Sequence, residues 1–154
     1  MTLKVNSFNA LAWVAVAALV LASVEAGGLA ADMKLDVQLL WGTDDAKSPN
    51  PKHKPVEPDL REKLKKIPLK WKNYFEVTHK IVEIPMGATR TVALSEMCDL
   101  EIKNIDGTKT EVTHFGKGKR VGTHTQAMPK GEVFILGGDA PGATAWLVVL
   151  RRNE

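Results

Sequence analysis

The stretch EVFILGGDAPGATAWLVVL, residues 132–150, decides the fold that the sequence predicts. It contains two apolar runs, residues 133–136 and 146–150, and the segment between them is rich in turn-forming residues. Short apolar runs without polar alternation are typical of strands that are buried on both faces. The stretch therefore predicts a central hairpin of two buried strands, against which the rest of the chain packs.

Six further segments carry strand patterns. In the first of them, residues 33–41, Leu35, Val37 and Leu39 alternate with polar residues, which predicts a strand with one buried face and one solvent face. The other five are residues 69–85, 89–94, 98–104, 108–115 and 120–127. With the central hairpin they make about eight short strands, which predicts an all-β, mainly antiparallel β-sandwich or flattened barrel.

One helix is expected among these strands, after an irregular loop. Residues 42–58 contain four prolines, which remove amide donors and predict a surface loop. Residues 58–67 then predict a short helix, because Leu60, Leu64 and Ile67 form an apolar stripe at helical spacing. Acidic residues precede basic ones along this segment, as the helix dipole favours.

A turn at Asn104-Ile105-Asp106-Gly107 sets the expected register of one hairpin. A type I turn with glycine in the left-handed position would place Asn104 opposite Thr108. Cys98 would then lie directly opposite His114. The alternative two-residue turn at Asp106-Gly107 would break the apolar face, so the first register is preferred.

The first 26 residues predict a secretory signal peptide. The apolar run over residues 11–22 is short for a membrane span but fits the hydrophobic region of a signal sequence, and small residues follow it. Cleavage is expected after Ala26, or otherwise after Ala30 or Ala31, and an uncleaved membrane anchor is the alternative. Residues 27–154 would then form one periplasmic or secreted domain.

Charge and cysteine content narrow the class of protein. The chain carries 21 basic and 18 acidic residues, a net charge of +3, which does not indicate a dedicated nucleic-acid binder. Cys98 is the only cysteine, so the stability of the domain must come from its core and not from internal disulfides.

Four residues are candidates for metal or thiol chemistry: Cys98, His114, His79 and His124. A thiolate beside an imidazole could bind copper or act as a nucleophile with its base. No HxH or HxxxH spacing is present, and the alternative is that each of the four is an ordinary buried or surface residue. For Cys98 a packed, unreactive thiol is preferred.

A cluster of lysines and aromatic residues suggests a ligand-binding surface made of Lys70, Trp71, Lys72 and Tyr74. Cations beside aromatic rings can bind anionic polymers. The preferred alternative is a solvated helix end followed by a strand with core aromatics.

No catalytic triad spacing, paired-carboxylate motif or nucleotide fingerprint stands out in the sequence. The segments LLWGTDD (residues 39–45), KWKNYFEV (70–77) and LGGD…AWLVVL (136–150) resemble small exported proteins of environmental bacteria. That resemblance implies export and no particular activity. The sequence thus favours a non-enzymatic β-sandwich without a cofactor that binds a protein or a cell-envelope component, and not a membrane or a specific nucleic acid. A metal- or thiol-dependent protein using Cys98 and His114 is the alternative.

Overall fold

Two antiparallel sheets face each other across an apolar core. The structure, a computed structural model, describes residues 31–140 and 142–153, so the expected signal peptide lies outside the described residues. The five-stranded sheet has the order β2 (Lys54–Pro55), β3 (Asn73–Ile84), β1 (Met33–Thr43), β9 (Thr144–Arg152), β8 (Val133–Ala140). The four-stranded sheet has the order β4 (Thr89–Ser95), β5 (Cys98–Asn104), β6 (Lys109–Gly116), β7 (Lys119–Ala127). The predicted antiparallel β-sandwich is confirmed, and the sheets do not close into a barrel.

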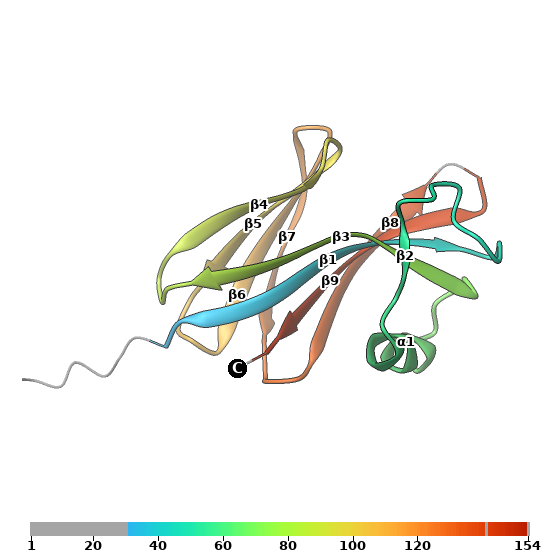
Figure 1. The fold of residues 1–154 in the computed structure, drawn as a ribbon. Helices are drawn as coiled ribbons and strands as arrows, with labels where there is room; N and C mark the ends of the chain where they lie inside the picture. Colours follow the sequence, from blue (N-terminus) through green and yellow to red (C-terminus); the bar gives the residue numbers. More distant parts are fainter. Residues whose placement is uncertain (1–30, 141, 154) are drawn as a thin grey trace, which may run out of the picture.

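The five-stranded sheet packs against the other sheet on one face and against α1 over part of its opposite face. On one face Leu35, Val37 and Leu150 pack against residues of the other sheet such as Leu100 and Ile102. On the opposite face lies the one helix of the described chain, α1 (Pro58–Lys65), as Figure 1 shows. Its buried residues form a second apolar cluster with β1 and β9, comprising Leu40, Val56, Leu60, Leu64, Leu147 and Val149. The predicted helix is confirmed with buried Leu60 and Leu64, but it ends at Lys65, so Ile67 lies beyond it and is half-buried.

The centre of the sheet differs from the prediction. Strand β9 is interior as expected, but its hairpin partner β8 is an edge strand, and the central pair is β1 and β9. The prediction that one face of β1 is exposed to solvent is also wrong, since Asp36 and Gln38 are only 5% and 3% exposed. The reason is that β1 has a strand on each side, whose side chains cover its second face: Asp36 accepts a hydrogen bond from Arg151 Nη2 at 2.9 Å, and His79 Nε2 lies 3.4 Å from its other oxygen.

A bulge in β3 changes the direction of side chains near one end of the sheet. Leu39 pairs with Thr78 while the next residue, Leu40, pairs with Glu76, so Val77 has no partner of its own on β1. An extra residue of this kind bends the strand and redirects its side chains. Val77 packs against the inter-sheet core.

The register of the β5–β6 hairpin was predicted wrongly by two residues. Asn104 pairs with Thr110 and Leu100 pairs with His114, so Cys98 lies opposite Gly116. The side chain of buried Asn104 takes part in the turn, because its Oδ1 accepts a hydrogen bond from Gly107 N at 2.8 Å. Gly107 does have the expected left-handed backbone, with φ of 82°. A shift of two residues keeps every side chain on its face, so Cys98 and His114 still share one.

The two sheets diverge toward one end of the sandwich. They meet where β3 continues into β4, and the tips of the β4–β5 and β6–β7 hairpins point away from the tip of the β8–β9 hairpin (Figure 1). The candidate site lies between the diverging sheets.

Candidate ligand-binding groove between the sheets

A cavity of about 570 Å³ lies between the two sheets, and we refer to it as the inter-sheet groove. Cavities of this size are in the range of small-ligand sites. Its walls come from both sheets and from the loop after β1, and the lining residues are Leu39, Leu40, Trp41, His53, Val77, Ser95, Met97, Cys98, His114, Gly116, Lys117, Val121, Ala140 and Trp146.

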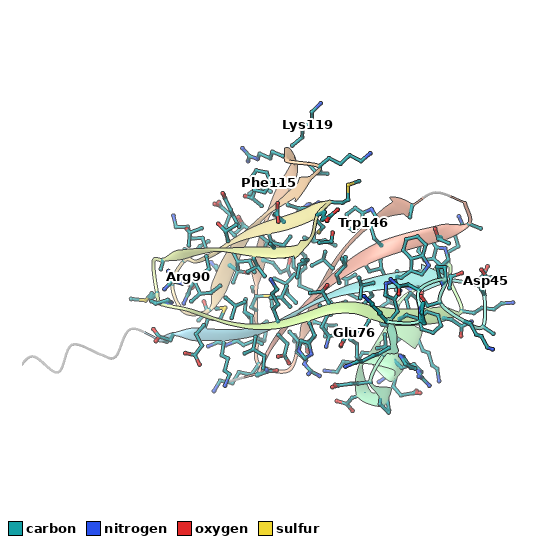
Figure 2. All side chains as sticks on the ribbon, turned by 45° about the horizontal axis from the view of Figure 1, so that its top comes forward. Asp45, Glu76, Arg90, Phe115, Lys119 and Trp146 are labelled. Carbon is teal, nitrogen blue, oxygen red and sulfur yellow. The ribbon has the colours of Figure 1, made fainter. Side chains whose placement is uncertain are left out.

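Two tryptophans on adjacent strands form the wall contributed by the five-stranded sheet. Trp41 on β1 and Trp146 on β9 are direct cross-strand partners, so both side chains project from the same face. The ring of Trp146 lies 4.8 Å, centroid to centroid, from that of His114 on the other sheet. Figure 2 shows Trp146 in the space between the sheets. The two rings therefore give the groove a broad aromatic surface.

A glycine on β8 makes room for this arrangement. Gly138 is the cross-strand partner of Trp146, and a Cβ atom added to it would lie 2.4 Å from Cζ2 of the indole. Any other residue at position 138 would displace the ring, since real Cβ contacts are longer than 3.0 Å. Glycine is required at this position by the close approach of the indole, and its φ is not in the left-handed range.

The opposite wall presents apolar side chains to solvent. Met97, in the β4–β5 turn, is 52% exposed, and Val121 on β7 is 63% exposed. These are two of the five large apolar residues that are exposed among the described residues, and both line the groove. Exposed apolar surface concentrated at a concave site is typical of a binding surface.

The polar groups of the groove are held in their uncharged forms. Burial lowers the pKa of His53, and burial followed by the charge of His124 lowers the pKa of His114. His53 Nδ1 lies 2.6 Å from Ser48 Oγ, which fixes the orientation of the imidazole. Among the described residues, Lys117 is the one lysine or arginine that lines the groove, and it lies in the exposed β6–β7 turn. At neutral pH the interior of the groove therefore carries no charge.

Cys98 is a packed residue of this wall. Cys98 is 6% exposed, and burial together with the charge of Asp99 raises the pKa of its thiol to about 11. His114 lines the same groove but lies opposite Leu100, so the predicted direct pairing of the two is wrong. The structure thus brings Cys98 and His114 to one cavity without making them cross-strand partners.

The other two candidate histidines lie elsewhere. His79 projects from the outer face of the five-stranded sheet, where its Nε2 is 3.4 Å from Asp36 Oδ1 and its Nδ1 is 3.7 Å from Glu76 Oε2. His124 is exposed on β7, and its ring packs edge-on against Phe134. Within the described residues, no group of three or more His, Cys, Asp or Glu side chains is arranged to hold a metal ion.

The predicted basic and aromatic cluster lines a second cavity. This cavity, of about 680 Å³, lies between α1 and the start of β3, and we refer to it as the basic cleft. Trp71, Lys72 and Tyr74 belong to its lining, together with Arg61 and Lys65 of the helix. Lys70 does not line it, but its Nζ lies 5.6 Å from the centroid of the Trp71 ring.

Sequence reasoning missed the residues that define the inter-sheet groove. The sequence predicts that Trp146 lies in a fully buried core strand, whereas it is only half-buried, and it predicts that Trp41 lies in a half-buried strand without a role. The one signal in the sequence is the Gly137-Gly138 pair, which predicts a turn but lies within β8, where Gly138 faces the indole.

Comparisons with known proteins give no match: no family model, no curated protein and no solved structure is significantly similar to the chain. Among the described residues, no helix has the length and apolar character needed to cross a membrane.

Proposed function

We propose that the protein is an exported, non-enzymatic binding module, periplasmic or secreted, that holds an apolar group of a cell-envelope component in the inter-sheet groove. The observation that carries this proposal is the groove itself, whose walls combine the paired indoles of Trp41 and Trp146 with the exposed side chains of Met97 and Val121. Covering such surface with an apolar ligand gains roughly 25 cal/mol per Å² of apolar area removed from water.

The protonation states in the groove support an apolar ligand. Two imidazoles whose pKa values are lowered and a thiol whose pKa is raised are all neutral near pH 7. An apolar group that enters the groove therefore does not strip water from a buried charge, which would be costly. Lys117 at the exposed turn is placed to meet a polar or anionic end of the same ligand.

A second candidate function is chemistry at Cys98 and His114, which the shared groove favours. The thiolate is the reactive and metal-binding form of cysteine. Because the pKa of Cys98 is raised to about 11, this form is scarce at neutral pH, and we rank the thiol hypothesis below apolar binding. The rate of alkylation of Cys98 at neutral pH separates the two.

The binding proposal is tested with a neutral apolar fluorophore, N-phenyl-1-naphthylamine, and two glutamate variants. Val121→Glu places a charge on the wall of the groove, whereas Ile81→Glu places the same charge at a site of similar exposure, 60% against 63%, on the outer face of the other sheet. We expect saturable binding to the wild type and to Ile81→Glu, and binding weaker by on the order of tenfold to Val121→Glu.

Two results would contradict the proposal: no saturable binding to the wild type, or equal losses in both variants. If the fluorophore binds as expected, competition by lipids extracted from the cell envelope then tests the class of ligand. We expect envelope lipids to displace the fluorophore at lower concentrations than a neutral sugar does. Displacement by the sugar at the lower concentration would reject an apolar ligand.

A further inference from the structure

The positive charge of the chain is concentrated next to the basic cleft. Residues 61–72 contain six basic residues and one acidic residue, a net charge of +5, while the whole chain carries +3. The remaining 142 residues therefore carry a net charge of −2. Charge of one sign gathered at a concave surface raises the local concentration of ligands of the opposite sign.

The cations of the cleft are available to a ligand to different degrees. Lys72 is exposed, and none of its side-chain contacts within the described residues is an ion pair. Lys65 pairs with Glu62 at 2.7 Å, but both side chains are more than 60% exposed, and ion pairs of this kind contribute little and exchange readily. The side chain of Arg61, which lines the cleft, donates from Nη2 to Val56 O at 3.3 Å, and a guanidinium group has four further N–H donors.

Hydrogen bonds fix the aromatic wall of the cleft. Tyr74 Oη donates to Trp71 O at 2.9 Å, and Trp71 Nε1 donates to Ala143 O at 3.1 Å. The backbone N–H of Lys72 donates to Asp44 Oδ1 at 3.1 Å. A wall that is ordered before binding loses little conformational entropy when a ligand docks.

We infer that the basic cleft binds an acidic oligosaccharide, whose carboxylates meet the cations of α1 and β3 while its sugar rings pack against Trp71, Tyr74 and Phe75. The cleft supplies what such a ligand needs, because cationic and aromatic side chains line the same cavity. The distribution of charge favours a carbohydrate over a nucleic acid. A nucleic-acid strand carries one phosphate per roughly 3.4 Å and needs a long track of cations, whereas the residues outside 61–72 carry a net charge of −2.

The test uses an oligogalacturonate of defined length as the probe and its fully methyl-esterified form as the uncharged counterpart. The cleft variant is Lys65→Gln/Lys72→Gln, and the control variant is Lys103→Gln/Lys119→Gln, which removes two exposed lysines from the other sheet. All four lysines are exposed, so both variants are expected to have the same midpoint of thermal unfolding as the wild type. A thermal melt of each variant checks this.

We expect the wild type and the control variant to bind oligogalacturonate with equal affinity, the cleft variant to bind it about tenfold more weakly, and the ester to bind to none of them. Equal binding of the acid and the ester would overturn the role of charge. Unchanged affinity in the cleft variant would overturn the site, and so would the absence of binding to the wild type. Tighter binding of an oligothymidylate than of oligogalacturonate at the same salt concentration would replace the carbohydrate by a nucleic acid. None of these results depends on the inter-sheet groove.

Discussion

Replacing Gly138 with alanine tests how the inter-sheet groove is built. The added Cβ would lie 2.4 Å from Cζ2 and 2.8 Å from Cε2 of Trp146, whereas ordinary contacts begin at 3.4 Å. The indole must therefore move by about 1 Å, and its contact with the ring of His114, 4.8 Å away between centroids, must change as well. Forcing a side chain out of a packed position costs about 1–3 kcal/mol.

The matched control is Gly122→Ala, on β7. Its added Cβ would meet His124 Nε2 at 3.5 Å, which is an ordinary contact, and neither glycine has a left-handed backbone. Alanine is favoured over glycine within a strand, so the control is expected to be as stable as the wild type or slightly more stable.

The assay combines urea denaturation with binding of N-phenyl-1-naphthylamine. Gly138→Ala is expected to lower the free energy of unfolding by about 1–3 kcal/mol and to weaken binding of the fluorophore, because the displaced indole occupies part of the groove. Identical denaturation midpoints and affinities for Gly138→Ala and Gly122→Ala would refute the placement of Trp146 against Gly138.

Four further predictions concern buried polar groups. Cys98 should react slowly with iodoacetamide at pH 7, and the rate of alkylation should rise about tenfold for each pH unit up to the thiol pKa of about 11. Fast labelling of the folded protein at pH 7 would favour the thiol hypothesis. Burial opposes ionisation of Asp36, but hydrogen bonds from three neighbours, led by Arg151, outweigh it and lower its pKa. The carboxylate of Asp36 therefore stabilises the fold at pH values above the unfolded pKa, and this stabilisation is lost as the pH falls through the folded pKa. Urea denaturation should show Asp36→Asn to be less stable than the wild type by about 1 kcal/mol at pH 7 and equally stable in acid. Because the pKa of His114 is lowered, the neutral form is favoured in the fold, and both stability and fluorophore affinity should fall as the pH drops below 6.5, a dependence that His114→Gln should reduce. Asn104→Ala should cost about 1–3 kcal/mol in the same denaturation assay, since it removes the donor to Ile84 O and the acceptor for Gly107 N from a buried site.

Local sequence patterns predicted the elements of the fold well. Strand β5 (Cys98–Asn104) has the bounds that its alternation predicts, and α1 begins at Pro58 as expected. These features depend on periodicity and on turn residues within a few positions, which the sequence contains directly.

The wrong predictions concern features that depend on contacts between residues far apart in the sequence. The apolar runs at residues 133–136 and 146–150 look alike, yet only the second lies in an interior strand, since β1 pairs with β9 from the far end of the chain. The β5–β6 register shifted because the side chain of Asn104 takes the place of a backbone partner in the turn. A shift of two residues preserved the faces, so the prediction that Cys98 and His114 share a face survived the wrong register.

The candidate site was predictable only in part. The cluster of Lys70, Trp71, Lys72 and Tyr74 was visible because its residues are close in sequence, and three of the four line the basic cleft. The inter-sheet groove was not visible, because Trp41, Val121 and Trp146 meet only through the divergence of the two sheets, and no local pattern encodes that divergence.

The most direct test of the central proposal is an NMR titration that follows the indole N–H signals of the tryptophans while N-phenyl-1-naphthylamine is added. Trp41 and Trp146 line the inter-sheet groove, whereas Trp71 lines the basic cleft and serves as an internal control. We predict saturable shifts of the Trp41 and Trp146 signals at one common affinity, with the Trp71 signal unchanged. A shift of Trp71 alone, or no saturable shift of either groove tryptophan, would contradict binding between the sheets.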